Sequence, residues 1–304
     1  MKTALSTTTN TLSLKAIFTD FKEITKAGLA ISVLFSSIAG YLLGFNEDQP
    51  FQWSVLLMLC VGGYCMVGAS NAFNQVIEKD IDALMDRTKN RPVPSGRMSA
   101  NVALLVASLL TLIGLTLLYL INPKTAMFGA ISIFLYTSVY TPLKTVTSLS
   151  VFVGAFPGAI PFMLGWVAAT GNFGIEAGTL FLIQFFWQFP HFWSIGWFLY
   201  EDYEKAGIFM LPTGKKDKGT ALQVILYTVW LIIASLLPCV GYTGKLFISP
   251  YTAVIVFLLG IWMLYYAVRL YNVKTAKAAR TLMLVSVSYI SLLQLVYIID
   301  KFLR

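Results

Sequence analysis

The stretch NVALLVASLLTLIGLTLLYLI, residues 101–121, contains no charged side chain. A helix rises about 1.5 Å per residue, so a run of this length crosses the roughly 30 Å hydrocarbon layer of a bilayer. The whole chain has the same character, because 57% of its 304 residues are hydrophobic and only 12% are charged. Soluble domains carry about 25% charged residues. The sequence therefore predicts a protein whose main solvent is lipid.

Eight further runs are similar to this one in length and apolarity, and charged or Pro/Gly-containing breaks separate them. The predicted spans lie near residues 27–45, 53–73, 101–121, 125–143, 149–169, 177–199, 222–242, 250–268 and 281–299. We therefore expect an all-α, polytopic bundle of about nine transmembrane helices. Residues 1–20 are rich in Thr and Ser and predict a disordered cytoplasmic tail, and residues 21–304 predict a single transmembrane domain.

The basic residues are distributed unevenly between the predicted loops. If the N-terminus is cytoplasmic, 18 of the 22 Lys and Arg residues lie inside. The outside segments keep Lys124, Lys245, Lys301 and Arg304. Because cytoplasmic loops are enriched in Lys and Arg, this split predicts the N-terminus inside and the C-terminus outside. The net charge of +8 is then mainly a consequence of topology and of attraction to anionic lipid, and we do not expect nucleic-acid binding.

The stretch NQVIEKDIDALMDRT, residues 74–88, extends the second predicted span into a long charged loop. Asn74, Glu78, Asp82 and Asp86 recur every four residues, so they form one polar stripe on a helix. Such oxygen ligands suit Mg²⁺, which usually takes one or two carboxylates and is completed by substrate phosphates. The stripe is about 18 Å long. One ion can reach only part of it, and we favour the first three residues, with Asp86 as a further candidate.

Basic residues follow the acidic stripe at once, namely Arg87, Lys89, Arg91 and Arg97. Guanidinium groups bind phosphate oxygens in a bidentate manner, so the combination predicts a diphosphate site held partly through metal. A solvated helix end with pairing between residues four apart, followed by a positive-inside loop, explains the same spacing. Spacing alone leaves both interpretations open.

His191 is the only histidine in the chain and lies in the predicted span 177–199, directly after Pro190. Ionisable groups inside a membrane are costly, which makes this histidine a functional candidate. Gln188 and Asp202 fall on roughly the same helix face. The alternative is a structural histidine that is hydrogen-bonded to a neighbouring helix.

The acidic residues, followed by Arg87-Thr88 and Arg91-Pro92, resemble the first acidic motif of the UbiA-type membrane prenyltransferases. Members of that superfamily have nine transmembrane helices and transfer a prenyl group from an allylic diphosphate to an acceptor, using Mg²⁺. Within it, the chain resembles the branch that farnesylates protohaem IX. The closer resemblance is carried by residues 74–88, 140–144, 158–161 with 165–166, 187–192, 202–212 and 278–286.

The resemblance implies a reaction. Farnesyl diphosphate would lose its diphosphate, the farnesyl cation would add to a vinyl group of haem b, and water would quench the new cation to give haem O for haem-copper oxidases. The residues that we expect at the diphosphate are Asn74, Glu78 and Asp82 with Mg²⁺, then Arg87, Arg91 and Lys144, with Asp202 and Tyr203 in a second motif and Asp202 as a further metal candidate. We expect His191, with Gln188, to contact haem, as an axial ligand of the iron or through a propionate.

The expected partners are farnesyl diphosphate, haem b and membrane lipid, with haem A synthase or terminal oxidase assembly proteins acting downstream. The expected location is the plasma membrane of a bacterium, with the active site facing the cytoplasm. Ala27-Gly28 and Ser150 depart from the pattern of the branch, and no role is assigned to them.

Two competing functions fit part of the pattern. One is a related membrane prenyltransferase that acts on a quinone precursor or another aromatic acceptor. The other is a non-enzymatic haem carrier, in which Pro157, Pro161 and Pro190 would interrupt helices around a site at the membrane midplane. The carrier leaves the acidic stripe and its arginines unexplained.

Overall fold

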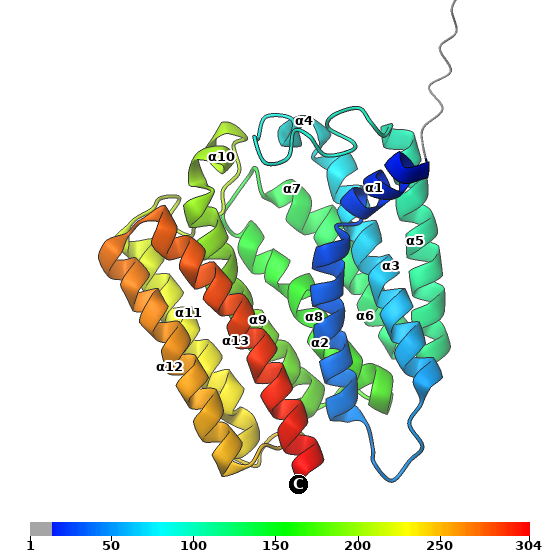
Figure 1. The fold of residues 1–304 in the computed structure, drawn as a ribbon, viewed down its shortest axis with the longest axis vertical. Coiled ribbons are helices and arrows are strands. Elements are labelled where there is room, and N and C mark those ends of the chain that lie inside the picture. The colour runs from blue at the N-terminus through cyan, green and yellow to red at the C-terminus, as the bar shows by residue number, and fades with distance from the viewer. Residues whose placement is uncertain (1–13) are drawn as a thin grey trace, which may run out of the picture.

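The computed structural model describes residues 14–304, and within that range it contains helices and no strand. The long helices lie side by side in one bundle (Figure 1). The helices are α1 (Leu14–Ile24), α2 (Ala27–Gly44), α3 (Trp53–Ile77), α4 (Lys79–Asp82), α5 (Ala100–Ile121), α6 (Pro123–Phe134), α7 (Thr141–Leu143), α8 (Ser150–Thr170), α9 (Ile175–Phe198), α10 (Tyr200–Lys205), α11 (Lys218–Leu236), α12 (Pro250–Val273) and α13 (Ala276–Leu303). A π-helical turn, Leu135–Tyr140, joins α6 to α7, and a 3₁₀ turn, Leu237–Cys239, follows α11.

The predicted all-α membrane bundle is confirmed. Eight helical segments of the described residues are long and apolar enough to cross a membrane. The predicted span 177–199 is not among these eight. It corresponds to α9, which has 24 residues and packs against α8, α11 and α13. Its glutamines, proline and histidine make it less apolar than the other eight.

The prolines of α8 and α9 do not interrupt these helices. Pro157 and Pro161 lie inside α8, and Pro190 lies inside α9, yet both helices continue through them. Broken helices of the kind expected for the haem carrier are therefore absent from this part of the described chain.

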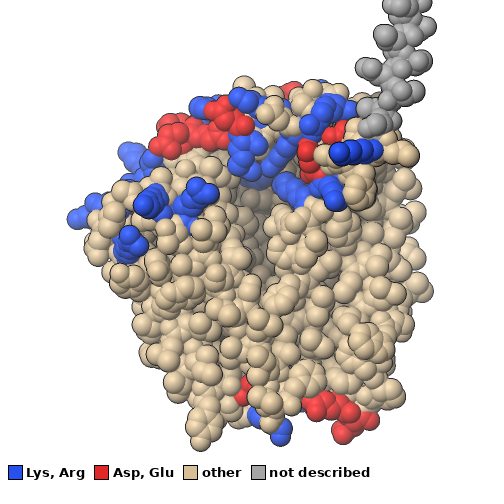
Figure 2. All heavy atoms as spheres, in the orientation of Figure 1, with Lys and Arg blue, Asp and Glu red and all other residues tan. Residues whose placement is uncertain are grey.

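The long helices form a ring of two halves. One half contains α2, α3, α5, α6 and α8, and the other contains α9, α11, α12 and α13. The halves meet where α8 packs on α9 and where α2 packs on α13. Figure 2 shows a hollow below the charged rim, in the region where Figure 1 has α2 and α13.

Charged side chains gather at one end of the bundle. The short helices α4, α7 and α10 lie at this end together with α1, and the C-terminus lies at the other end (Figure 1). In Figure 2 a broad band without charged residues separates the two ends. This is the charge distribution of a protein whose apolar belt faces lipid and whose ends face water. We call the end with α4, α7 and α10 the charged end.

Two glycines allow α2 and α8 to approach each other closely. A Cβ atom at Gly40 would overlap the carbonyl oxygen of Phe162, and one at Gly165 would overlap the carbonyl oxygen of Ser37. Small residues at a helix crossing let backbones pack directly, which is a main source of helix association in lipid.

The structure differs from the predicted disordered tail, residues 1–20, at residues 14–20. Residues 1–13 lie outside the described residues, whereas residues 14–20 belong to helix α1. Apolar residues at positions 14, 17, 18, 21 and 24 recur at helical spacing, and this gives α1 one apolar face. Asp20, near its end, forms an ion pair with Arg97 at 3.1 Å. The prediction of disorder was therefore wrong for residues 14–20.

Replacing Gly165 by alanine should weaken the crossing of α2 and α8. The added methyl group has no space beside the Ser37 carbonyl, and overpacking of this kind costs about 1–3 kcal/mol. We expect a lower thermal unfolding midpoint for Gly165→Ala in detergent. Gly178→Ala is the matched control, because nothing lies within 4 Å of a Cβ there. Equal midpoints for the two variants would contradict the close crossing.

Candidate active site

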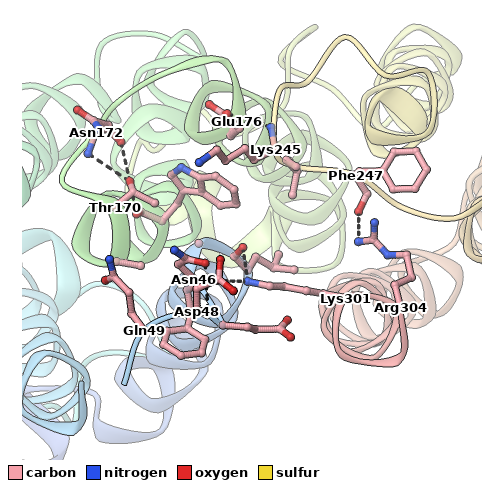
Figure 3. Close-up of a pocket in the computed structure, with 17 residues that line it drawn as sticks. Asn46, Asp48, Gln49, Thr170, Asn172, Glu176, Lys245, Phe247, Lys301 and Arg304 are labelled. Atoms are coloured by element: carbon pink, nitrogen blue, oxygen red, sulfur yellow. Dashed lines mark hydrogen bonds between the residues drawn. The ribbon is translucent and has the colours of Figure 1, made fainter. Parts of the chain in front are cut away.

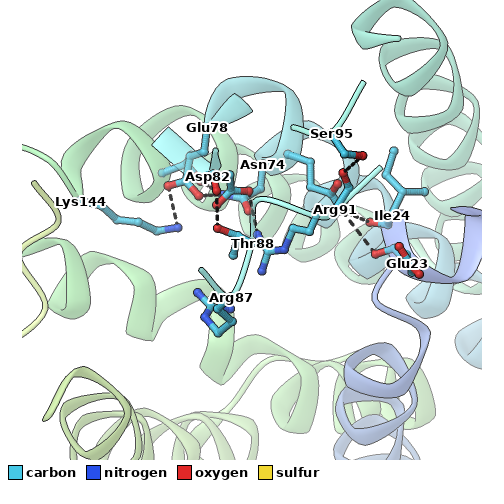
Figure 4. A network of polar contacts seen from close by, with 12 residues as sticks. Glu23, Ile24, Asn74, Glu78, Asp82, Arg87, Thr88, Arg91, Ser95 and Lys144 are labelled. Atoms are coloured by element: carbon cyan, nitrogen blue, oxygen red, sulfur yellow. Dashed lines mark hydrogen bonds and ion pairs between the residues drawn. The ribbon is translucent and has the colours of Figure 1, made fainter. Parts of the chain in front are cut away.

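The three favoured residues of the acidic stripe come together at the charged end (Figure 4). Asn74 lies on the last turn of α3, and its Nδ2 donates to Glu78 Oε2 at 2.7 Å and to Thr141 Oγ1 at 3.3 Å. Glu78 separates α3 from α4, and Asp82 ends α4. All three side chains are buried.

Each buried carboxylate is paired with a cation from another segment. Lys144 Nζ lies 2.9 Å from Glu78 Oε1, and Arg91 Nη1 lies 2.8 Å from Asp82 Oδ2. Lys144 also lies over the ring of Tyr140, with its Nζ 4.6 Å from the ring centroid. Acids and bases that are separate in the sequence therefore form one compact cluster.

Lys144 stays positively charged in this cluster. Burial opposes its charge, but the negative charge of Glu78 and the hydrogen bond to that carboxylate outweigh burial and raise the pKa of Lys144. A buried ammonium whose charged form is stabilised by a neighbouring carboxylate is suited to hold an anionic substrate.

The loop between α4 and α5 is held in place by the second motif. The Asp202 carboxylate accepts hydrogen bonds from the backbone N–H groups of Asp86 at 2.9 Å and Arg87 at 3.4 Å. The Arg87 guanidinium lies over the ring of Tyr203, 5.8 Å from its centroid. Thr88 adds a third anchor, because its hydroxyl donates to the Asp82 carbonyl at 2.7 Å. Asp202 and Tyr203 thus hold the loop that carries the predicted diphosphate contacts.

Asp86 lies outside the cluster. The helix that the spacing predicted breaks at Glu78, and the chain leaves the helical path after Asp82. Asp86 is consequently exposed, and its carboxylate bonds Lys205 and Lys89, each at 2.7 Å. Hydrogen bonds to these two lysines lower its pKa to about 2. These contacts describe a surface ion-pair network between the loop and α10.

The sequence assigned no role to Lys26, which lies next to the cluster. It occupies the elbow between α1 and α2 in a left-handed conformation, with φ of 48°. Gln75 on α3 anchors this elbow, because its Nε2 donates to the carbonyls of Glu23 at 3.3 Å and Ile24 at 3.5 Å. Burial and the nearby charge of Arg91 lower the pKa of Lys26 to about 7. The feature that marks Lys26 is its proximity to the other cations of the site. The sequence does not show this proximity, because these cations are far from Lys26 along the chain.

The donor set fits Mg²⁺ in combination with a diphosphate. Within residues 14–304, no group of three or more His, Cys, Asp or Glu residues forms a metal cluster by itself. However, Mg²⁺ usually takes only one or two protein carboxylates and obtains its other oxygens from phosphate and water. Glu78 Oε1 is buried and accepts no well-oriented hydrogen bond, although Lys144 lies close. Asn74, Glu78 and Asp82 are therefore suitable ligands.

His191 and Gln188 belong to a different part of the bundle. His191 Nδ1 lies 2.9 Å from Ser286 Oγ on α13, and Gln188 Nε2 donates to the Gly158 carbonyl on α8 at 3.0 Å. The predicted site residues thus form two groups, with the charged cluster at one end and the α9 pair inside the bundle.

A large cavity at the opposite end of the bundle has another character (Figure 3). Its volume is about 720 Å³, and charged groups of both signs line it. Lys301 donates to the carbonyls of Leu42 and Leu43, each at 2.9 Å, and Arg304 donates to that of Phe247 at 2.7 Å. These hydrogen bonds join the end of α13 to the end of α2 and to the loop before α12.

The helical bundle and its diphosphate-suited cluster define a membrane prenyltransferase. The model of the UbiA prenyltransferase family matches residues 33–292, and the chain belongs to this family. A relative from Flavobacterium johnsoniae, named protoheme IX farnesyltransferase, is 83% identical over 295 residues, which cover 97% of this chain and 98% of the relative. Relatives with the same name are 75% identical in Flavobacterium psychrophilum and 67% identical in Christiangramia forsetii, over 97% and 95% of this chain and 99% and 95% of those relatives.

Solved structures share the fold at low sequence identity. A digeranylgeranylglyceryl phosphate synthase has a TM-score of 0.78 at 18% identity, covering 94% of this chain and 99% of its own. A UbiA homologue from Archaeoglobus fulgidus, solved with GPP and Mg²⁺, has a TM-score of 0.62 at 14% identity over 92% of this chain and 99% of its own.

The charge of Lys26 should make diphosphate binding depend on pH. Because its pKa is about 7, Lys26 is protonated below that pH and loses its charge as the pH rises. We expect the affinity for inorganic diphosphate with Mg²⁺ to fall as the pH rises through about 7. In Lys26→Arg the side chain stays charged, and this component of the pH dependence should disappear. Calorimetric titrations between pH 6 and 9 measure both curves.

Protonation of diphosphate itself affects both proteins equally. The difference between the two curves therefore reports Lys26 alone. Parallel curves for the natural protein and Lys26→Arg would contradict a contact between Lys26 and diphosphate.

Proposed function

We propose that this protein transfers the farnesyl group of farnesyl diphosphate to a vinyl group of haem b, producing haem O and diphosphate. The observation that carries the proposal is the buried cluster of Glu78, Asp82, Lys144 and Arg91, found in a chain that is 83% identical to a protoheme IX farnesyltransferase. The UbiA homologue solved with GPP and Mg²⁺ supports a prenyl diphosphate and Mg²⁺ as ligands.

The first chemical task is to stabilise the departing diphosphate. Bound Mg²⁺, held by Asn74, Glu78 and Asp82, would neutralise charge that develops on the leaving oxygens. Lys144 and Arg91 already lie in the cluster as charged donors, so diphosphate oxygens can replace carboxylate oxygens as their partners. Arg87 supplies a further guanidinium from the anchored loop. Donors placed in advance stabilise such charge more effectively than donors that must reorient.

The second task is to protect the farnesyl cation from water. The residues Asn74, Glu78 and Asp82 are all buried, so the proposed leaving-group site is largely closed to solvent. Exclusion of bulk water prevents side reactions of a reactive intermediate. The vinyl group of haem then meets the cation before water does, and a single water completes the product.

The haem would bind on the α9 side of the bundle. We propose His191 as the residue that contacts haem, with Gln188 on the same helix face. Asp202 and Tyr203 hold in place the loop that contains Arg87. Asp202 is also a further candidate for a metal ligand. Haem A synthase and terminal oxidase assembly proteins remain predicted downstream partners.

Asp82→Asn should abolish most of the activity. The substitution removes the buried carboxylate that pairs with Arg91, and loss of such an electrostatic contribution costs about 100-fold in rate or more. The assay incubates purified protein in lipid with farnesyl diphosphate, Mg²⁺ and haem b, and haem is then analysed by mass. Asp80→Asn is the matched control, because Asp80 lies on the same short helix and is exposed.

Each outcome of this assay has a clear meaning. A farnesylated, hydrated haem supports the proposed function, and an unchanged haem beside another farnesylated acceptor supports the related prenyltransferase. A near-normal rate for Asp82→Asn would reject the metal assignment.

We further propose that the protein spans the plasma membrane of a bacterium and that its charged end faces the cytoplasm. A cysteine-free background with Lys215→Cys or Tyr242→Cys tests this orientation, because both positions are exposed and lie at opposite ends. A membrane-impermeant maleimide should label Tyr242→Cys on intact cells and should label Lys215→Cys only after permeabilisation. The opposite pattern would invert the topology.

A further inference from the structure

The contact between α9 and α13 is built around one imidazole. His191 Nδ1 lies 2.9 Å from Ser286 Oγ, and the indole of Trp187 stacks on the imidazole with centroids 4.5 Å apart and planes 18° apart. The indole Nε1–H donates to the Ser286 carbonyl at 2.7 Å. Two residues of α9 thus hold the same residue of α13, and the imidazole cannot rotate freely.

The hydrogen bonds of Ser286 determine which nitrogen of His191 carries the proton. The Ser286 hydroxyl donates to the Met283 carbonyl at 2.7 Å. A hydroxyl has one proton to donate, so its oxygen is left to accept from the imidazole. With the Ser286 proton directed to the Met283 carbonyl, we assign the proton of a neutral His191 to Nδ1, which leaves a lone pair on Nε2. The side chain is partly exposed, and the described residues offer Nε2 no hydrogen-bond partner.

We propose that Nε2 of His191 binds the iron of haem b as an axial ligand and that Ser286 is the residue that positions it. This inference rests on the proposed function, since it assigns a contact to the haem substrate. It also distinguishes between the two roles expected of His191, which are ligation of the iron and a hydrogen bond to a propionate. A propionate needs a hydrogen-bond donor, whereas Nε2 in this tautomer offers a lone pair, which suits iron.

The arrangement matches a common design of metal-binding histidines. The ring nitrogen that does not bind the metal usually donates to a carboxylate, a carbonyl or water, and this fixes the tautomer and the ring orientation. Here the Ser286 hydroxyl takes that place, and Trp187 covers one face of the imidazole. The apolar surroundings of α9 favour a neutral imidazole over a charged one.

The position of His191 along α9 suits a reaction at the charged end. His191 lies seven residues before Phe198, where α9 ends, so it is about 10 Å inside the bundle by helical rise. A porphyrin ligated at this depth can extend one edge toward the diphosphate cluster. The reacting carbon of farnesyl diphosphate is attached to the diphosphate, so a vinyl group must approach that end.

The first test is spectroscopic. Purified protein in lipid is titrated with haem b, and absorption and resonance Raman spectra are recorded. We expect an iron–imidazole signature in the natural protein and its loss in His191→Gly. Added imidazole should restore the signature in His191→Gly, because it replaces the missing ligand. A natural protein without the signature, or a variant that keeps it, would overturn the proposal.

The second test addresses Ser286. In Ser286→Ala the Nδ1 proton has no acceptor, and loss of such a partner usually costs 10–100-fold in metal affinity. We expect haem affinity to fall at least about 10-fold and KM for haem to rise, with KM for farnesyl diphosphate unchanged. Ser288→Ala is the matched control, since Ser288 is exposed on the same helix and bonds the Leu284 carbonyl. Equal haem affinities for the two variants would reject the positioning role.

Product analysis on the same samples distinguishes this inference from the proposed function. If the natural protein makes farnesylated haem and His191→Gly keeps its haem spectrum, ligation is wrong while the function stands. If the natural protein shows the iron–imidazole signature but makes no farnesylated haem, the function is wrong and haem ligation stands alone.

Discussion

The burial of Glu78 and Asp82 is the constraint on which the charged end depends. An unpaired carboxylate is costly in a site of low dielectric constant, and removing one partner of a buried pair costs about 3–5 kcal/mol. Lys144 and Arg91 meet this requirement at 2.9 and 2.8 Å. One cation follows α7, and the other lies in the loop after α4. The pairs therefore connect three segments that the helical bundle alone would leave independent.

The same pairs account for the chemistry that the cluster can perform. A prenyl diphosphate with its metal carries net negative charge. When it binds, it stabilises the positively charged form of the basic side chains around it. Lys144 is already charged, whereas Lys26 has a pKa of about 7 and is only partly protonated near neutrality. An incoming anion would draw the missing proton onto Lys26. Cation charge at the site can thus increase when substrate binds, without a conformational change.

The bundle and its spans follow from simple features of the sequence. Runs of about 20 apolar residues between charged breaks predicted every long helix, and α5 was expected at 101–121 and runs over Ala100–Ile121. Periodicity also found Asn74, Glu78 and Asp82, because three residues at four-residue spacing stay close even when the helix breaks at Glu78. It placed Asp86 on the same stripe, where the structure has an exposed residue bonded to Lys205.

Other parts of the site depend on contacts that periodicity does not encode. Lys26 lies near the charges of the cluster, in an elbow with a left-handed backbone conformation that Gln75, about 50 residues away, anchors. The helix at residues 14–20 was hidden by the Thr- and Ser-rich stretch before it, although its apolar spacing was visible. Pairing of His191 with Ser286 spans 95 residues. Such long-range contacts require the folded chain.

The polar residues of the candidate site form two groups, which lie on different halves of the bundle. Residues suited to diphosphate lie on α3 and α4, directly after α7 and in the loop after α4, whereas the imidazole lies on α9 and is fixed by α13. These elements belong to opposite halves of the ring, and the hollow in Figure 2 lies where α2 and α13 bring the halves together. Under the proposed function, two substrates would be held by different halves and would approach each other along this boundary. Polar residues of α9 would be costly in contact with lipid, and the packing of α9 against α8, α11 and α13 removes much of this helix from the bilayer.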